Sequence, residues 1–380
     1  MQDTASHPPV ATRPDLAGWV RLTLTPGVGP ATCRLLLDSF ATPARVFAAP
    51  RAQLAAMVGS ALAQALRHPA DDQLRRVDAA LAWAEAPGNA ILTMADPAYP
   101  PLLRNIADPP ALLYVSGRAG LLTAPCLAMV GSRNASVQGK INAEVFAQAL
   151  SMTGLTIVSG LALGIDTAAH VGALEGAGAT IAVVGTGPDI VYPARNRELW
   201  RRIAGQGCVL SEYAPGTPPL AHNFPQRNRI ISGLSAGVLV VEAAARSGSL
   251  ITARLAAGQG REVFAIPGSV HSALAKGCHL LIKEGAKLVE SAADVLQELR
   301  LSPIARIGMP QEAAAPAEHA EHAALLDAIG HGPLGLDAIA LAHGCAPHEA
   351  VAALLDLELG GAVERLPDGR FQRVVRPLSA

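Results

Sequence analysis

Aromatic residues are scarce in this sequence, because Phe, Trp and Tyr together make up 3% of its 380 residues. Extensive stacking of nucleobases on aromatic rings is therefore excluded. Charge is scarce as well: Asp, Glu, Lys and Arg account for 16% of the residues, and the formal net charge is -1. Since the whole molecule carries no basic field, any surface that binds nucleic acid must be a local patch.

Cysteine motifs and membrane segments are also missing. The five cysteines form no Cys-x-x-Cys pair, which argues against a disulfide framework and against a metal site. They are predicted to be small core residues in a reducing compartment: Cys33, Cys126, Cys208, Cys278 and Cys345. Residues 1–14 lack an apolar signal core, and no apolar run approaches the roughly 18 residues of a membrane span. With half of its residues hydrophobic, the chain is expected to be a soluble, cytoplasmic protein with a sizeable core and no membrane partner.

What the sequence does contain is an alternation of apolar runs and helical patterns between Ala124 and Leu299. Six apolar runs are interpreted as strands: Cys126–Val130, Thr156–Ser159, Thr180–Val184, Cys208–Leu210, Gly237–Val241 and Glu262–Ile266. Fully apolar strands that alternate with helices are typical of a parallel sheet covered on both faces. A Pro-rich leading segment with a strand-like run at Leu112 to Val115 precedes them. Residues 86–299 are therefore predicted to form a Rossmann-like α/β domain.

The N-terminal side is predicted to be helical. Residues 1–14 are polar and are expected to be a mobile tail, and residues 15–85 have an Ala- and Leu-rich helical pattern. Within it, the run Gly27-Val28-Gly29 joins two apolar helices as in a helix-hairpin-helix or SAM-like domain. Such motifs contact DNA phosphates in some proteins and are only scaffolding in others, so both interpretations stay open.

The C-terminal side is predicted to be a small winged-helix-like domain. Residues 300–321 are rich in Ala, Pro and Glu and are interpreted as a linker. Residues 322–380 contain two short strand-like runs around Pro367-Asp368-Gly369, preceded by three helical patterns: Ala323–Ile329, Leu336–His343 and Pro347–Leu359. Because acidic residues offset its arginines, this domain is expected to be dispensable for binding nucleic acid.

The segment from Phe224 to Ser235 is the most informative candidate site. It places Arg227, Asn228 and Arg229 in a row, and no acid–base pair or activated nucleophile accompanies them. Two guanidiniums beside an amide suit a phosphate backbone, because each guanidinium offers a planar fork of donors and a permanent charge. The alternative is a solvated helix face.

Three further turns stand between a predicted strand and a predicted helix. Their glycines, hydroxyls and free backbone amides are arranged to receive an anion. The residues are Gly131, Ser132 and Arg133 in the first turn, Gly160 and Gly164 in the second, and Ser247, Gly248, Ser249 and Thr252 in the third. Helix capping or packing would explain each turn alone. In a parallel sheet, however, such turns converge at the carboxyl ends of the strands, where these folds bind ligands.

Several motifs of enzymes and metalloproteins are absent or out of context. The run from Gly185 to Gly187 begins like a dinucleotide fingerprint, but Ile190 replaces its third glycine. The run from Gly233 to Gly237 matches a nucleophile elbow literally, but a helix precedes its serine and a strand follows it. No Walker A motif occurs, and the His319–His322 run is interpreted as solvated linker. No catalytic residue, cofactor or metal is therefore expected.

These motifs together resemble the DNA-processing protein A family (DprA, also called Smf). The resemblance covers most of residues 95–295 in order, and its motifs are highly specific. They are Val-Gly-Ser-Arg at 130–133, Ser-Gly-Leu-Ala-x-Gly-Ile-Asp-x-x-Ala-His at 159–170, Tyr-Pro-x-x-Asn at 192–196, Phe-Pro-x-Arg-Asn-Arg-Ile-Ile-Ser-Gly-Leu-Ser at 224–235 and Ser-Gly-Ser-Leu-Ile-Thr-Ala at 247–253. The regions on either side are similar to accessory parts of the family but much less diagnostic.

The resemblance implies a non-catalytic protein that binds and protects single-stranded DNA and loads the RecA recombinase onto it during natural transformation. It places the DNA groove at Gly131, Ser132 and Arg133 and at Arg227, Asn228 and Arg229. Independently of the resemblance, Phe224 is the one aromatic residue of the motifs that is well placed to stack on a base. One position departs from the family: Leu163 stands where a basic residue is common. Neighbouring arginines could compensate for it, namely Arg195, Arg197 and Arg246.

The resemblance also implies a homodimer, formed through the segment from Gly277 to Leu288. His279, Ile282 and Leu288 are its expected contacts, and burial in the core of one chain is the alternative for the apolar pair. Two other functions stay open. A Rossmann-like enzyme that cleaves nucleoside monophosphates would need a Pro-Gly-Gly-x-Gly-Thr-x-x-Glu signature, and Glu242 has no such glycine run before it. A nucleotide-sensing scaffold would use the same turns for a small phosphate ligand.

Overall fold

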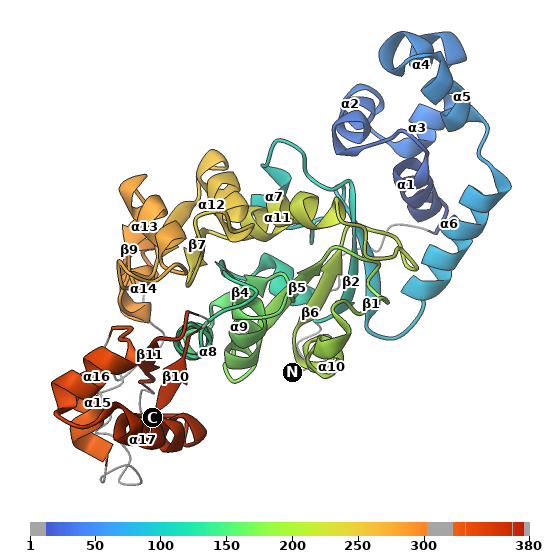
Figure 1. Cartoon of the computed structure of the whole chain (residues 1–380). Helices are drawn as coiled ribbons and strands as arrows, with labels where there is room; N and C mark the ends of the chain where they lie inside the picture. The colour runs from blue at the N-terminus through green and yellow to red at the C-terminus, as the bar shows by residue number, and fades with distance from the viewer. Residues whose placement is uncertain (1–12, 302–321, 331, 367, 376–380) are drawn as a thin grey trace, which may run out of the picture.

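The computed structural model describes residues 13–301, 322–330, 332–366 and 368–375 (Figure 1). Almost all of the predicted tail and linker, with His319, lies outside these residues.

A nine-stranded sheet forms the centre of the molecule, with the strand order β1-β2-β6-β5-β4-β3-β7-β8-β9. Seven neighbouring strands, from β6 to β9 in this order, run parallel, which confirms the predicted parallel sheet. Strands β2 and β1 extend it at one edge in antiparallel fashion. The bounds are β1 Asn89–Thr93, β2 Leu112–Gly117, β3 Cys126–Val130, β4 Thr156–Ser159, β5 Thr180–Val184, β6 Cys208–Ser211, β7 Gly237–Val240, β8 Glu262–Ala265 and β9 Lys287–Leu288.

The six predicted strands are all present, each within one residue of its predicted end. Two strands were not predicted. In β1 only Ile91 and Thr93 are buried, and β9 has two residues, both exposed, so neither strand shows the continuous apolar run by which the others were found.

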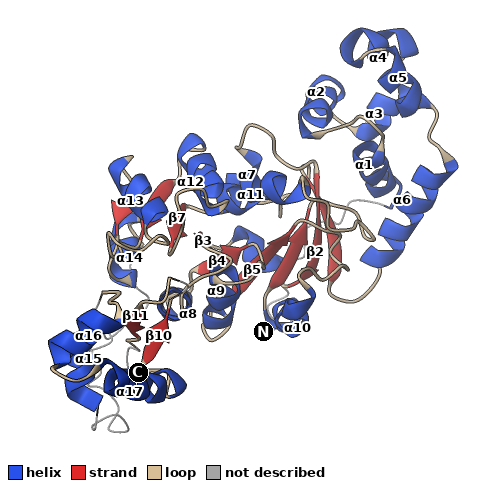
Figure 2. Cartoon of the chain, in the orientation of Figure 1, coloured by secondary structure: helices blue, strands red, loops and turns tan. Residues whose placement is uncertain are grey.

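Helices cover both faces of the sheet (Figure 2). The face that Cys126, Ala128 and Val130 share packs against α7, α11, α12 and α13. Leu127 and Met129 point to the opposite face and pack against α8, α9 and α14. This alternation follows from the two-residue period of a strand. The bounds are α7 Pro101–Arg104, α8 Val137–Met152, α9 Ile165–Ala173, α10 Arg197–Gln206, α11 Asn223–Leu234, α12 Ser249–Gly258, α13 Lys276–Lys283 and α14 Ala292–Glu298.

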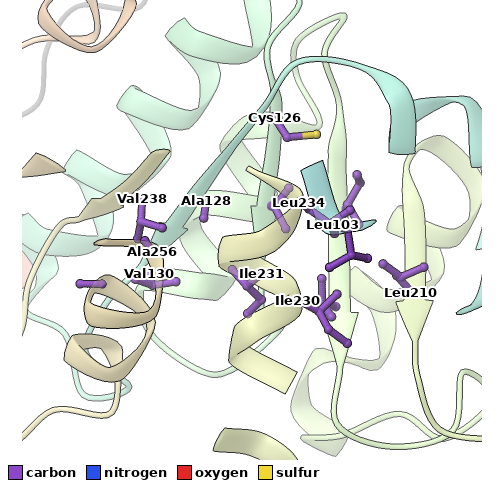
Figure 3. Packing of buried hydrophobic residues seen from close by; sticks show 14 of the residues in the cluster. Leu103, Cys126, Ala128, Val130, Leu210, Ile230, Ile231, Leu234, Val238 and Ala256 are labelled. Atoms are coloured by element: carbon purple, nitrogen blue, oxygen red, sulfur yellow. The ribbon is translucent and has the colours of Figure 1, made fainter. Parts of the chain in front are cut away.

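Helix α11 is held tightly on the sheet. Figure 3 shows Ile230, Ile231 and Leu234 of this helix among the side chains of the strands, beside Leu103 of α7. All four are at most 3% exposed. The apolar half of the Phe224–Ser235 motif therefore fixes the position of the helix that carries its polar half.

The N-terminal part consists of six helices that pack on the β1–β2 edge of the sheet, where Ile91, Leu112 and Tyr114 join their apolar cluster. The helices are α1 Arg13–Leu24, α2 Pro30–Phe40, α3 Pro43–Ala48, α4 Arg51–Val58, α5 Ser60–Arg67 and α6 Asp71–Ala84. The turn between α1 and α2 contains Gly27 with a φ of 87°, a backbone conformation that glycine adopts without strain.

The C-terminal part is the predicted winged helix. Helices α15 Ala323–Ile329, α16 Leu336–His343 and α17 Pro347–Leu359 precede a hairpin of β10 Val363–Arg365 and β11 Phe371–Arg373. A separate apolar cluster holds them together. No single helix in the described ranges has the length and apolarity of a membrane span; only the bent pair α16 and α17 passes that test, by length and composition alone.

Candidate nucleic-acid interface

A cavity of about 750 Å³ opens at the carboxyl ends of β3 and β7. These neighbouring strands mark the point where the strand order reverses, since β4 lies on one side of β3 and β7 on the other. Ligands of open α/β sheets bind at such a switch point. We call this hollow the switch-point cavity.

Most of the predicted site residues line the switch-point cavity. They are Gly131, Ser132, Arg133, Phe224, Arg227, Asn228, Ser247, Gly248, Ser249 and Thr252. Gly160, Gly164 and Arg229 are not part of its lining. The convergence that was expected from the strand ends therefore brings together the first turn, the start of α11 and the third turn.

The first turn is fixed by backbone contacts that leave its arginine unpaired. The Ser132 amide donates to Glu242 O at 2.7 Å, and Ser132 O accepts from the Ile165 amide at 3.1 Å. A Cβ atom at Gly131 would lie 2.6 Å from the Ile165 side chain, so only glycine fits there. Arg133 is exposed and has no hydrogen-bond or ion-pair partner among the described residues. Its charge is therefore available to an anion.

Gly160 and Gly164 do not line the cavity but pack against residues that do. Gly164 has a φ of 78°, and a Cβ there would collide with the carbonyl oxygens of Ser132 and Arg133. A Cβ at Gly160 would lie 2.6 Å from the Arg227 guanidinium. Both glycines thus permit close packing against residues of the lining.

Arg227 lines the cavity but is 4% exposed. Its Nη1 donates to Gly160 O at 2.7 Å and also to Val183 O. Burial lowers the pKa of this guanidinium to about 10, and the charge of Asp166 opposes that shift. Arg227 therefore links strand β5 to the loop that follows β4. Its charge adds positive potential to the wall of the cavity.

Arg229 lies in a different place from the one expected. It is 6% exposed, its Nε is 3.1 Å from Asp108 Oδ2, and its Nη2 donates to Glu212 Oε1 at 2.5 Å. Burial raises the pKa of Glu212, and the charge of Arg229 opposes the shift. Residues two positions apart on an α-helix point about 200° from each other, so Arg227 and Arg229 cannot serve one surface. The interpretation as a solvated helix face fails as well, since both guanidiniums are buried.

The third turn contributes hydroxyls, amides and a free arginine. Ser247 Oγ and Ser249 Oγ are 2.7 Å apart, and the Ser249 amide donates to Ser247 Oγ at 3.3 Å. A Cβ built at Gly248 meets nothing within 4 Å, so this backbone faces open space at the start of α12. Arg246 lines the cavity, is exposed, and has no hydrogen-bond or ion-pair partner in the described part of the chain.

Tyr192 was missed as a site residue. It is 47% exposed, lines the cavity, and its ring centroid is 5.4 Å from that of Phe224 at an interplanar angle of 41°. Gly185 leaves room for Phe224, because a Cβ there would lie 3.0 Å from the ring. The Tyr-Pro-x-x-Asn motif contained the signal, since Asn196 Nδ2 donates to Leu161 O at 2.9 Å and ties this loop to the cavity.

The charges of the lining favour an anion over acid–base chemistry. The lining contains three arginines, Arg133, Arg227 and Arg246, and one carboxyl group, that of Asp166, whose charge interacts with Arg227. Burial raises the pKa of Asp166, although Arg227 and the amides of Gly160 and Ala162, which donate to its carboxylate, oppose the shift.

His170, on the next turn of α9, has no exposed surface, and burial lowers its pKa to about 3. Its Nε2 accepts from the Leu161 amide at 3.3 Å, and its Nδ1 lies 2.7 Å from Thr180 Oγ1. This neutral imidazole positions a loop and does not reach the cavity. In the described ranges no three His, Cys, Asp or Glu side chains are grouped as a metal site would require.

The residues expected at a dimer interface lie on α13 and on β9, the strand that ends the sheet beyond β8. Leu288 is 42% exposed on β9, the edge strand. Ile282 of α13 is partly buried against the main core, and His279 Nε2 is 2.9 Å from Gly268 O. Leu163, the departure from the family pattern, is half-buried beside the cavity loop.

Two protein-family models match this chain. The family described as DNA recombination-mediator protein A matches residues 90–300, and the DprA winged helix domain matches residues 309–369. The DNA processing protein DprA of Streptococcus pneumoniae is 55% identical over 203 residues, covering 53% of this chain and 72% of that protein. Protein Smf of Escherichia coli is 41% identical over 300 residues, covering 78% and 80%.

Two solved structures of DNA processing protein A also match this chain. The crystal structure of the Streptococcus pneumoniae DNA processing protein A matches with a TM-score of 0.56 and 42% identity, over 71% of this chain and 98% of that one. A Helicobacter pylori DNA processing protein A, described as having a unique single-stranded DNA binding mode, matches with a TM-score of 0.51 and 30% identity, over 56% and 95%. Because the family model covers more than half of the whole chain, the chain belongs to the DNA recombination-mediator protein A (DprA/Smf) family.

Proposed function

We propose that this protein binds single-stranded DNA in the switch-point cavity without sequence preference. The observation that carries the proposal is the pair Arg133 and Arg246, two exposed guanidiniums in one cavity that no described residue neutralises. Guanidiniums, free amides and a helix N-terminus hold phosphates, and contacts of this kind carry no base information. The Helicobacter pylori relative, whose description names single-stranded DNA binding, supports the same ligand.

The bases of the strand would lie against the rings of Tyr192 and Phe224. Two aromatic side chains suffice for one or two bases, in keeping with the few aromatic residues of the sequence. A base in a duplex is stacked on its neighbours and offers no free face, so ring stacking selects single strands.

In the cell, the protein would process DNA for transformation and recombination, protect the incoming strand and load a RecA recombinase onto it, without catalysis of its own. Family membership supports the role in DNA processing. The engaged Asp166 carboxyl group and the buried His170 support the absence of catalysis, since neither is free to exchange a proton with a substrate. The exposed Leu288 on an edge strand supports a homodimer.

Binding of fluorescent oligo-dT by the unchanged protein, Arg133→Ala and Arg246→Ala tests the proposal. Each substitution is expected to cost about 1–3 kcal/mol of binding free energy, because it removes a charge-assisted phosphate contact. Each should also lower the slope of log affinity against log salt by about 0.7, the value for one phosphate of a single strand. Arg75→Ala, an exposed arginine of α6 that pairs with Asp72, is the matched control.

Unchanged affinity and salt slope in both variants would contradict the proposed cavity. Release of free base from nucleoside monophosphates, measured in parallel, would establish the enzymatic alternative instead.

A further inference from the structure

The winged helix lies against the sheet domain at helix α8, as Figure 1 shows, and contacts its first two residues. The Glu364 carboxylate of β10 accepts a hydrogen bond from the Val137 amide, at the first residue of α8, over 2.7 Å. Gln138 pairs with the backbone of Val375 in both directions: its Oε1 accepts at 2.8 Å and its Nε2 donates at 3.1 Å. Arg370 Nη2 donates to His271 O at 3.1 Å. Three separate points of contact thus define one docked position.

This docking point adjoins the cavity. Asn134, which follows the first turn, also lines the cavity, and only two residues separate Asn134 from Val137. Three residues of chain span at most about 11 Å, so the Val137 amide that Glu364 holds lies within that distance of the lining at Asn134, although no winged-helix residue is part of the lining itself. A strand that fills the cavity and continues in this direction meets a negative charge and the hairpin behind it.

The contact is polar and therefore reversible. The apolar cluster of the winged helix draws all its described members from residues 325–371, and none comes from the sheet domain. Small polar interfaces between domains of one chain permit the domains to separate. Burial raises the pKa of Glu364, and the charge of Glu364 adds to the burial that raises the pKa of Glu242. Docking thus places two carboxylates near each other at the start of α8.

We propose that the winged helix is an autoinhibitory cover at the α8 end of the switch-point cavity, which a long single strand displaces. This inference rests on the proposed binding of single-stranded DNA. A short strand binds with the cover in place, whereas a longer strand binds only the fraction of molecules in which the hairpin has left α8. Its apparent affinity is reduced by that fraction. The cover thereby lowers the affinity of the protein for long strands relative to short ones.

Two oligo-dT probes of about 6 and about 25 nucleotides, one near the lower end of common single-strand site sizes and one beyond their upper end, test the inference in the full chain. Glu364→Gln removes the negative charge, and Gln138→Ala removes both hydrogen bonds to Val375 from the other side of the contact. If the hairpin is docked in most molecules, each variant binds the long probe about 3- to 10-fold more tightly, with no change for the short probe. Glu358→Gln makes the same charge change on the exposed face of α17 and should behave as the unchanged protein.

Hydrogen exchange supplies a second readout. The long probe is expected to speed exchange of the Val137 and Val375 amides in the unchanged protein, because their partners Glu364 and Gln138 leave. Equal affinities in all variants, weaker binding in Glu364→Gln and Gln138→Ala, or slower exchange at these amides would each overturn the cover. If the unchanged protein binds neither probe, the proposed function falls together with it. If it binds both probes and the variants show no gain, only the cover falls.

Discussion

The arginines around the switch-point cavity differ in what surrounds each guanidinium. Arg133 and Arg246 reach solvent and have no described partner. Arg227 donates to two backbone carbonyl groups, and Arg229 forms ion pairs with two carboxylates. The first two can exchange water for phosphate at little cost, whereas the other two are committed to the fold. Substitutions at the two kinds of arginine should therefore affect different quantities.

Arg229→Ala is expected to destabilise the fold. It leaves Glu212, whose side chain is 16% exposed, without its closest cation. Removing one partner of a buried pair costs about 3–5 kcal/mol, and the residual exposure of Glu212 argues for the lower end. Chemical denaturation at pH 7 measures the loss. Affinity for oligo-dT, measured where the variant is folded, should fall much less than in Arg133→Ala.

The loss in Arg229→Ala should depend on pH. Burial raises the pKa of Glu212 even beside Arg229, and without the guanidinium the folded pKa rises further. A carboxyl group whose pKa is higher folded than unfolded contributes stability below the unfolded value, and this contribution is lost as the pH rises through the folded pKa. The difference from the unchanged protein is therefore smallest near pH 4 and grows toward neutrality. A difference that shrinks with rising pH would refute this account.

Tyr192 is expected to hold a base through its ring. Tyr192→Ala should weaken oligo-dT binding by about 1–3 kcal/mol, the usual worth of one base on an aromatic ring. Tyr192→Phe keeps the ring and should bind as the unchanged protein. An oligonucleotide without bases separates stacking from phosphate contacts, because on it the alanine variant should lose nothing. Equal losses on both probes would mean that Tyr192 acts through its backbone loop.

At the scale of elements, the loop after β4 and the turn after β3 form one unit. The Ile165 amide donates to Ser132 O, and Gly164 passes so close to the carbonyl oxygens of Ser132 and Arg133 that a side chain has no space. The second turn thus shapes the first one without reaching the cavity.

Gly164→Ala is therefore expected to weaken both the fold and DNA binding. The φ of 78° and ψ of -123° at Gly164 lie in a backbone region that costs an L-residue about 1–3 kcal/mol, and the added Cβ pushes Arg133 from its position. Thermal melting and oligo-dT titration measure the two effects. Gly205→Ala on α10, where a Cβ meets nothing within 4 Å, should be neutral or stabilising. Full affinity in a folded Gly164→Ala protein would show that the two turns are independent.

The sequence predicted most elements, because apolar runs and helical periods are local signals. The six inner strands and the three winged-helix helices follow from them. It could not predict the partners of individual arginines. Arg229 meets Asp108 and Glu212, which are distant in the chain, so only the helical period warned that it faces away from Arg227. Tyr192 was missed because a tyrosine before a proline reads as a turn, and its position beside Phe224 depends on two separate loops.

At the scale of the whole molecule, the switch-point cavity and the edge strand β9 occupy separate places on one sheet. The cavity lies between β3 and β7 near the middle, whereas β9 ends the sheet on the side away from the N-terminal helices. A partner could therefore pair with the edge without covering the cavity. Two copies joined in this way would present two cavities to one DNA strand. Once the strand is bound in one cavity, its effective concentration at the second cavity is raised.

Leu288→Glu is expected to convert the proposed homodimer into a monomer. Leu288 is 42% exposed, so the substitution should leave the melting temperature of the chain unchanged while it places a charge twice in a two-fold interface. Ile282→Glu is less informative, because Ile282 packs partly against the main core and its loss damages the fold. Leu359→Glu, at an 80% exposed leucine of the winged helix, is the matched control. Light scattering gives the mass of each variant, and oligo-dT titration should show weaker but persistent binding by the monomer. A Leu288→Glu protein that stays dimeric would place the interface elsewhere, and dissociation by Leu359→Glu alone would place it on α17.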